Sequence, residues 1–142
     1  MSLPIREQIL QALATRTGAG RGLESYDGAN LPFTVLVEGE DSPGDSDYDL
    51  TRLVMPVTIA RAVERSGLKG DDWYTAANED LATLIQQAYT PDQDIDGLAD
   101  GIDYTGGDVG MLTDGASGYT VQINLEVRYA FLHGNPYSRE VI

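Results

Sequence analysis

The clearest pattern in the chain is a strict alternation of apolar and polar residues near the C-terminus. Apolar and aromatic side chains occupy every second position from Tyr119 to Phe131, and mostly polar residues such as Gln122, Asn124 and Glu126 stand between them. A period of two residues is typical of a β-strand with one face in the core. Because strands average about 5–6 residues, we expect this strand to be unusually long or bent.

Two further strands are predicted in the first half of the chain. The first, Leu31–Glu38, carries apolar side chains on both faces, which favours a strand covered on both sides. The second, Leu50–Glu64, is rich in β-branched residues and contains Pro56, which cannot donate a ladder hydrogen bond and therefore belongs at a sheet edge or a bulge. An acidic loop over residues 39–49 connects them, so a hairpin is the simplest topology.

The N-terminal segment predicts an amphipathic helix over Ser2–Thr17. Ile5, Ile9 and Leu13 recur at helical spacing. Ser2 is the expected N-cap, and Pro4 lies in the first turn, where a missing N–H costs nothing. The glycine-rich residues 18–22 end the helix.

A second helix is predicted over Ala76–Tyr89. A turn over Ser66–Asp72 precedes it, and Thr75 is its expected N-cap. Pro91 lies just beyond its end. Residues 92–118 are rich in Asp and Gly, and only a short strand over Gly101–Thr105 is expected there.

Together these elements predict the fold class. The order helix, strand, strand, helix, short strand, long strand indicates an α+β domain, with a mostly antiparallel sheet and two helices packed on one face. A length of 142 residues fits a single domain over residues 1–142.

Composition narrows the functional classes. The chain has no cysteine and one histidine, which excludes disulfides, cysteine-ligated metals and multi-histidine metal sites within one chain. A formal net charge of −14 argues against binding to DNA phosphates or to an anionic membrane surface. Neither a bilayer-spanning apolar run nor a signal-peptide pattern is present, so a soluble, cytoplasmic protein is expected.

Catalytic signatures are weak. A Ser-His-Asp triad would have to use His133, which stands beside the turn residues of Gly134-Asn135-Pro136, and no G-x-S-x-G elbow occurs. The glycines of residues 17–22 neither follow a strand nor open a clear helix, so a phosphate-binding loop is not expected. We therefore predict that the protein is not an enzyme and uses no cofactor.

One acidic segment resembles the start of an EF-hand calcium loop. Aspartate occupies loop positions 1, 3, 5, 9 and 12, which are ligand positions of an EF-hand. In order, these residues are Asp92, Asp94, Asp96, Asp100 and Asp103. Gly97 stands at position 6. Against calcium, position 12 is the shorter Asp, and the glycine-rich residues after it cannot form an exit helix. A Ca²⁺-dependent binding module is thus an alternative hypothesis, and the competing interpretation is an ordinary acidic loop.

The C-terminal segment carries a resemblance to a known family. A long strand with V-x-Y, followed after a few residues by G-[DN]-P-Y-S, resembles the C-terminus of tail terminator (tail completion) proteins of long-tailed bacteriophages and prophages. The residues here are Val127, Arg128, Tyr129, Gly134, Asn135, Pro136, Tyr137 and Ser138. Residues 88–103 also resemble that family, in a region where a helix ends before a short strand.

The resemblance implies a structural virion protein without catalytic residues. Such a protein would form a homo-oligomeric ring, a hexamer, that caps the tail tube, ends tail growth and presents a surface for joining the head. Its partners would be itself, the tail tube protein and the head-connector protein, first in the host cytoplasm and then in the virion tail. DNA would pass through the ring without being bound, and no membrane is involved. Another head–tail connector or a tube subunit is the alternative within virion proteins.

Two structural expectations accompany the resemblance. Residues 92–103 would form a helix-to-strand connection, with Ile95, Leu98 and Ile102 packed against the sheet. Part of the acidic stretches 39–49 or 92–114 would line the opening of the ring, where acidic side chains repel DNA.

Overall fold

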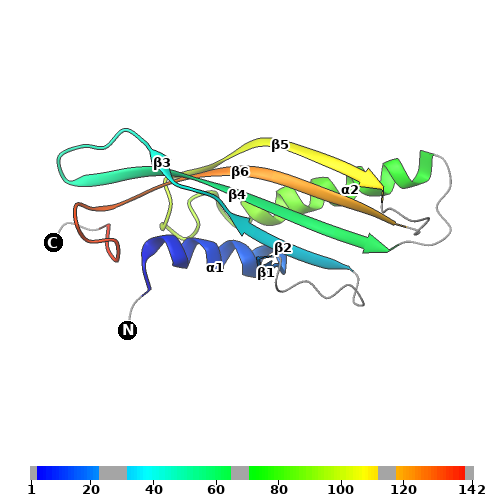
Figure 1. The fold of residues 1–142 in the computed structure, drawn as a ribbon, viewed down its shortest axis with the longest axis horizontal. Helices are drawn as coiled ribbons and strands as arrows, with labels where there is room; N and C mark the ends of the chain where they lie inside the picture. The colour runs from blue at the N-terminus through cyan, green and yellow to red at the C-terminus, as the bar shows by residue number, and fades with distance from the viewer. Residues whose placement is uncertain (1–2, 23–31, 65–70, 112–117, 140–142) are drawn as a thin grey trace.

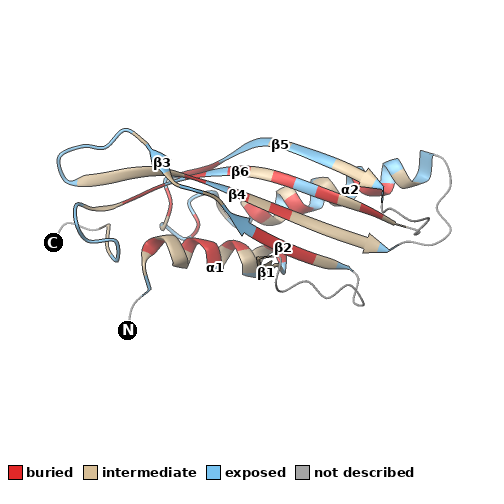
Figure 2. Ribbon diagram, in the orientation of Figure 1, coloured by how far each residue is buried: buried red, intermediate tan, exposed pale blue. Residues whose placement is uncertain are grey.

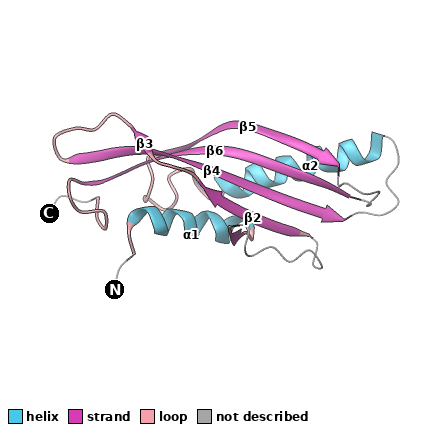
Figure 3. Cartoon of the chain, in the orientation of Figure 1, coloured by secondary structure: helices cyan, strands magenta, loops and turns pink. Residues whose placement is uncertain are grey.

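The structure, a computed structural model, describes residues 3–22, 32–64, 71–111 and 118–139. It is one α+β domain of two helices and a six-stranded sheet, which confirms the predicted fold class (Figure 3). In chain order the elements are α1 (Ile5–Thr17), β1 (Gly20–Arg21), β2 (Phe33–Glu38), β3 (Ser42–Pro43), β4 (Leu50–Glu64), α2 (Asp71–Tyr89), β5 (Gly101–Met111) and β6 (Gly118–Leu132).

The sheet is built around two long antiparallel strands (Figure 1). Its order is β1-β2-β4-β6-β5, and β3 pairs with β4 beyond the end of β2. β4 and β6 pair along their whole lengths, from Leu50↔Leu132 to Glu64↔Gly118. β2 pairs antiparallel with β4, so the predicted adjacency of these two strands is confirmed, whereas the two-residue β1 pairs parallel with β2.

The core lies on one face of this sheet (Figure 2). On β6 the odd-numbered side chains from Tyr119 to Tyr129 are all buried, whereas Gln122 and Glu126 of the opposite face are exposed. This confirms the one-sided strand that the alternation predicts. Both helices add apolar side chains to the same cluster, namely Ile5, Ile9, Leu10 and Leu13 from α1 and Ala76, Ala77, Leu84 and Ala88 from α2.

The expected covering of β2 on both sides is only half right. Leu36 faces the core, and Val35 on the other face is 8% exposed, but Val37 on that same face is 39% exposed. The reason is that both described helices pack on the core face. Pro56 lies in β4 between the ends of β2 and β3, where Gly39 N donates to Pro56 O at 2.8 Å. The expected position at a sheet edge or a bulge is wrong, because β4 is a central strand and Pro56 pairs with Glu126 of β6 in an unbroken register. The proline is tolerated because it lies opposite the gap between β2 and β3, where no strand residue is paired with it on that side.

The N-terminal helix begins three residues later than predicted. Pro4 is its N-cap and makes no side-chain cap bond, and Ile5 N donates to Pro136 O at 2.9 Å. The predicted cap Ser2 lies outside the described residues. Gly18 ends the helix in the left-handed region, with φ of 71°, as the glycine-rich stretch predicts.

The second helix begins earlier than predicted, and Thr75 is not its N-cap. The helix starts at Asp71, and the Thr75 hydroxyl donates to Asp71 O within it. Asp71 and Asp72 suit the positive end of the helix dipole, and Trp73 packs against the core, so the helix extends beyond its apolar stripe. Of the predicted turn over 66–72, residues 66–70 lie outside the described part. Neither described helix is long and apolar enough to span a membrane.

β5 continues to Met111, six residues past the predicted end at Thr105. Its glycine-rich half pairs with β6 from Gly106↔Asn124 to Met111↔Tyr119, after a bulge at Tyr104. This half is held by backbone hydrogen bonds to β6. Such bonds do not require alternating apolar side chains, so the sequence contains no pattern that predicts this part of the strand. The same reason explains why the short strands β1 and β3 were not predicted.

Candidate functional surface

The segments that the sequence analysis singled out meet at one end of the sheet. The first residue of β4, Leu50, pairs with the last residue of β6, Leu132, so the acidic loop before β4 lies beside the turn after β6 (Figure 1). The start of β5 also lies here, since Gly101 pairs with Arg128. We call this region the loop end and define it as residues 39–50, 92–103 and 127–139.

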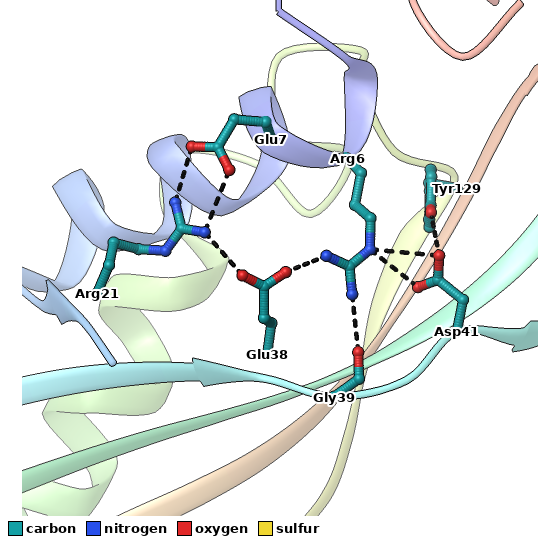
Figure 4. A network of polar contacts seen from close by, with 7 residues as sticks. All are labelled: Arg6, Glu7, Arg21, Glu38, Gly39, Asp41 and Tyr129. Carbon is teal, nitrogen blue, oxygen red and sulfur yellow. Dashed lines mark hydrogen bonds and ion pairs between the residues drawn. The ribbon is translucent and has the colours of Figure 1, made fainter. Parts of the chain in front are cut away.

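Tyr129 anchors the acidic loop at the loop end (Figure 4). The side chain is 1% exposed, and its hydroxyl donates to Asp41 Oδ2 at 2.6 Å. Arg6 of α1 donates from Nε to both oxygens of Asp41 at 3.2 Å and from Nη2 to Gly39 O at 2.7 Å. Burial, reinforced by the bond to Asp41, raises the pKa of Tyr129 well above its ordinary value. Tyr129 therefore stays a neutral hydrogen-bond donor that ties residues 39–41 to β6.

The same network continues along α1. Arg6 also pairs with Glu38, Glu38 accepts from Arg21 at 2.9 Å, and Arg21 pairs with Glu7 at 2.9 Å (Figure 4). The hydrogen bond from Arg21 lowers the pKa of the Glu7 carboxyl. Opposite charges alternate through the network, which joins α1, β1 and the end of β2. A single partly exposed ion pair stabilises a protein by only about 0–1 kcal/mol. Any sizeable stabilisation of the folded state here must therefore come from the connected network and not from one pair.

The family-like turn closes back on the fold. Asn135 N donates to Leu132 O at 2.8 Å, and Leu132 N donates to Ser138 O at 2.8 Å. Gly134 takes a positive φ of 74°, which favours glycine. Since Pro136 O accepts from Ile5 N, this turn supplies one of the acceptors that the first N–H groups of α1 need. The turn thus links the last strand to the first helix.

Arg128 borders a surface cavity of about 590 Å³ at the loop end. Its Nε donates to Asp103 Oδ2 at 2.8 Å, and its guanidinium lies over Gly101, where an added Cβ would stand 2.4 Å from Nη2. The cavity lining is Pro43, Gly44, Asp45, Arg52, Leu53, Val54, Asp100, Arg128 and Tyr129. Both arginines of the lining already have carboxylate partners, Arg52 in Asp47 and Arg128 in Asp103.

The five candidate calcium ligands do not converge. Asp92 pairs with Arg16 at 2.9 Å, which lowers its pKa, and Asp100 pairs with Arg139 at 2.7 Å. Asp103 pairs with Arg128, Asp94 accepts from Gly97 N at 3.3 Å, and Asp96 is exposed. In the described part of the chain no three acidic or histidine side chains are placed to hold a metal ion. The EF-hand spacing is therefore not matched by an EF-hand geometry.

The connection from α2 to β5 packs as the resemblance implies. Ile95 is 0% exposed and Ile102 is 2% exposed, and Leu98 packs partly buried against the core. Ile95 adopts a positive φ of 52°, which is rare for a β-branched residue. Burial of its side chain offsets the cost of that backbone conformation.

His133 holds the acidic loop from the other side. Its Nδ1 lies 2.7 Å from Thr51 Oγ1, and its Nε2 lies 2.9 Å from Asp47 O. Both ring nitrogens thus contact residues that position the loop, and neither contacts a serine. The absence of enzymatic activity stays a prediction.

Asp41 and Arg6 are the residues of this surface that sequence reasoning missed. Asp41 lies 88 positions from Tyr129 and 35 from Arg6, so no local spacing connects the three. The sequence signal for them is only an acidic loop and an amphipathic helix, and their pairing depends on the tertiary structure.

Comparison with models of known protein families gives no match, and a search of curated protein sequences gives none either. The family resemblance therefore rests on sequence motifs alone, namely residues 127–129 and 134–138 and the stretch 88–103.

Proposed function

We propose that this chain is a structural virion protein of the tail terminator type, which caps the tail tube of a long-tailed phage as a ring. The observation that carries the proposal is the pair of motifs V-x-Y and G-N-P-Y-S, residues 127–129 and 134–138. In support, both motifs lie in the loop end, where Tyr129 anchors the acidic loop and Pro136 O accepts a hydrogen bond from Ile5 N of α1. Their roles are structural, as expected for a protein that acts by assembly.

The proposed mechanism is association without chemistry. Head-to-tail contacts between identical subunits close into a ring when the rotation between neighbours allows it. β5 is the last strand of the described sheet on its side, so its outer edge offers backbone groups to a neighbour or to the tail tube protein. The net charge of −14 keeps the ring from adhering to DNA that passes through it.

The first test is the oligomeric state of the purified protein. We expect size-exclusion chromatography with light scattering to give one species of several subunits, and negative-stain electron microscopy to show rings of uniform diameter. A protein that stays monomeric at tens of micromolar would contradict the ring.

The position in the particle decides between a terminator and its two alternatives. Antibody labelling of dissected virions should mark the head-proximal end of isolated tails. Labelling along the whole tail would indicate a tube subunit, and labelling that stays with the heads would indicate a connector.

A further inference from the structure

The outer edge of β5 is the longest strand edge that no described strand covers. β5 stands at the end of the sheet order, so only its inner edge is paired, with β6. At the other end of the sheet, the two-residue β1 lies against the middle of β2. Figure 1 shows β5 along the margin of the sheet, with α2 behind it. A long open edge presents unpaired N–H and C=O groups, to which a further strand can bind.

Hydrogen bonds show which way the backbone of β6 faces. Arg128 O accepts from Asp100 N at 2.7 Å, and Asn124 O accepts from the Thr105 hydroxyl at 3.1 Å. The carbonyls of both even-numbered residues thus point toward β5. Because the backbone groups of an antiparallel strand alternate between its two neighbours, the even residues of β6 bond to β5 and the odd residues bond to β4.

The same alternation continues in the second half of β5. Gly106, Asp108 and Gly110 stand opposite even residues of β6, so their backbone groups are used inside the sheet. The backbone groups of the odd-numbered residues therefore face outward. In the described part of the chain, no residue hydrogen-bonds to them on that side. These residues are Gly107, Val109 and Met111.

Tyr89 of α2 ends this open stretch on its N-terminal side. The Tyr89 hydroxyl donates to Ile102 O at 3.1 Å, and the backbone of Tyr104 hydrogen-bonds to the same hydroxyl. Ile102 stands opposite the odd residue Val127, so its backbone also faces outward, and Tyr89 takes the place of a pairing strand there. The bulge at Tyr104 then shifts the outward positions from even to odd. The edge is therefore open from Gly107 onward.

Large side chains lie exposed along this stretch on the helix side of the sheet. Met111 is 58% exposed and Tyr104 is 41% exposed, although both stand opposite buried residues of β6. Gly107 lies between them, and an added Cβ there would stand 2.2 Å from the Tyr104 hydroxyl oxygen and 3.3 Å from Leu81 Cδ1. Tyr104 and Leu81 therefore form the surface that a residue opposite Gly107 would contact.

A second copy of this chain fits the edge in one symmetric register. Antiparallel pairing of β5 with itself about a two-fold axis at Val109 places Val109 opposite Val109 and Gly107 opposite Met111. Each of these outward residues then faces another outward residue, so every outward N–H and C=O gains a partner. Paired residues share a face of the sheet, so the two sheets continue into each other.

The apolar side chains fit this register. Met111 of one copy stands opposite Gly107 of the other copy and reaches Tyr104, and a methionine sulfur contacts aromatic rings favourably. The contact occurs twice, once on each side of the axis. Both exposed side chains are thus covered by the pairing.

The acidic residue of the edge selects between registers. With the axis at Val109, Asp108 stands opposite Gly110, so no carboxylate directly faces another. An axis one residue earlier would place Asp108 opposite Asp108, and like charges in that position are destabilising. The register centred on Val109 is therefore favoured.

We propose that two copies of this chain pair through their β5 edges, residues 107–111, about a two-fold axis at Val109. The contact is short, and small interfaces are weak, so we expect a dimer that dissociates on dilution. A two-fold contact closes with two copies and cannot by itself build a ring. The pairing is therefore independent of the contacts that the proposed ring requires.

Single-cysteine variants test the register, since the chain contains no cysteine. In the proposed pair the two Cα atoms at position 109 lie about 5.5 Å apart, within the span of a disulfide. Val109→Cys should cross-link about tenfold faster than Asp108→Cys in oxidised glutathione, measured on non-reducing gels. Asp108 is the matched control because it is the adjacent residue and is more exposed than Val109. A rate at position 108 that equals or exceeds the rate at 109 overturns the proposal.

Opposite charges at position 109 test the contact without a covalent bond. Val109→Lys and Val109→Asp each place two like charges across the axis, so each should raise the dissociation constant about tenfold in sedimentation equilibrium. Mixed together they should form a heterodimer, because a lysine then faces an aspartate. Val37→Lys, at a 39% exposed position on β2, is the control and should dimerise like the parent.

Thermal melting checks that the two charged variants are folded. If either is not, Met111→Ala replaces them, because that side chain is 58% exposed, and it should weaken the dimer severalfold. Folded charge variants that form no heterodimer, a Met111→Ala dimer as tight as that of the parent, or a parent that stays monomeric at high concentration overturns the proposal.

The outcomes separate this contact from the ring. Rings from the parent, without cross-linking of Val109→Cys, would overturn the pairing and leave the proposed function standing. A parent that forms no rings, with Val109→Cys cross-linked into a dimer, would support the pairing and contradict the ring.

Discussion

At the scale of single residues, Tyr129 and its partners do the most to define the loop end. The hydroxyl of this buried tyrosine meets a carboxylate from a loop that is distant in sequence, and Arg6 compensates the charge of that carboxylate. The Asp41 carboxylate is partly buried, so losing one of its two donors leaves a partly desolvated charge with a single partner, which costs stability. The position of the acidic loop therefore depends on individual hydrogen bonds.

Tyr129→Phe should destabilise the protein by about 1.5–3 kcal/mol, the usual value of a hydrogen bond to a charged group. The ring stays in place, so only the bond to Asp41 is removed. Urea unfolding measures the change, and Tyr137→Phe is the control because that side chain is 52% exposed. Equal stability of the two variants would show that the bond to Asp41 contributes nothing.

The ion pair of Glu7 predicts a pH dependence of stability. Arg21 lowers the pKa of Glu7 in the folded protein below its ordinary value of 4.5, so the unfolded chain takes up the proton first as the pH falls. The stabilisation by Glu7 is thus complete above about pH 5 and is lost as the pH falls below 4.5 through the folded pKa.

Urea unfolding of the parent and of Glu7→Gln from pH 7 to pH 3 tests this dependence. We expect the parent to be more stable at neutral pH and the difference to shrink steadily as the pH falls below 4.5. Glu40→Gln, at an exposed position in the acidic loop, should show a much smaller difference at every pH. A constant difference between parent and Glu7→Gln over the whole range would contradict the assignment.

At the scale of elements, the centre of the sheet follows from periodicity. β6 is buried on its odd-numbered face along most of its length, and β4 pairs with every residue of it. β2 pairs with β4 on one side, β5 pairs with β6 on the other, and α2 packs on β6, so these two strands form the centre of the fold.

Ile123→Ala should cost about 2–5 kcal/mol, because the side chain is 0% exposed in the hydrophobic core and its removal leaves a cavity there. Gln122→Ala, one residue away on the exposed face, should change the stability by less than about 0.5 kcal/mol. Urea denaturation of both variants makes the comparison. If both are tolerated equally, the inward face of β6 is assigned wrongly.

The loop over residues 92–103 leads to a prediction about calcium. Three of its five aspartates, Asp92, Asp100 and Asp103, pair with arginines from α1, the C-terminal segment and β6, so they are already neutralised by different partners. We expect the melting temperature in millimolar Ca²⁺ to equal the melting temperature in millimolar Mg²⁺. A rise of many degrees with Ca²⁺ alone would indicate a site in the native state, since a ligand that binds only the folded form stabilises it.

The sequence predicts the elements to different degrees, for physical reasons. The boundaries of β4 and β6 follow closely from β-branched composition and strict alternation, because one face of each is buried. The second half of β5 does not, because hydrogen bonds to β6 hold a run that includes Gly106, Gly107 and Gly110. Of the loop end, the sequence indicates the motif residues, but it cannot indicate their partners Asp41 and Arg6, which only tertiary structure brings near.

At the scale of the whole molecule, the sheet has one face that the described helices leave open. β5 and β6 place Asp103, Asp108 and Glu126 on that face, all exposed, with Arg128 paired to Asp103. The acidic stretch 92–114 therefore contributes to a broad negative surface as well as to a loop. In a ring through which DNA passes, such a surface suits the wall of the opening.

The last prediction tests whether this face lines the opening. Asp108→Lys combined with Glu126→Lys makes the face more positive by four charges and breaks no recorded ion pair. If the face lines the passage, particles assembled with this variant should eject DNA more slowly at low salt, because lysines bind phosphates by displacing counterions, and added salt should restore the rate. Asp72→Lys combined with Glu79→Lys on α2 makes the same change of charge on exposed positions outside this face and should leave ejection unchanged. Ejection at the parent rate by the first variant would mean that the open face of the sheet points away from the DNA and that its acidic residues serve solubility alone.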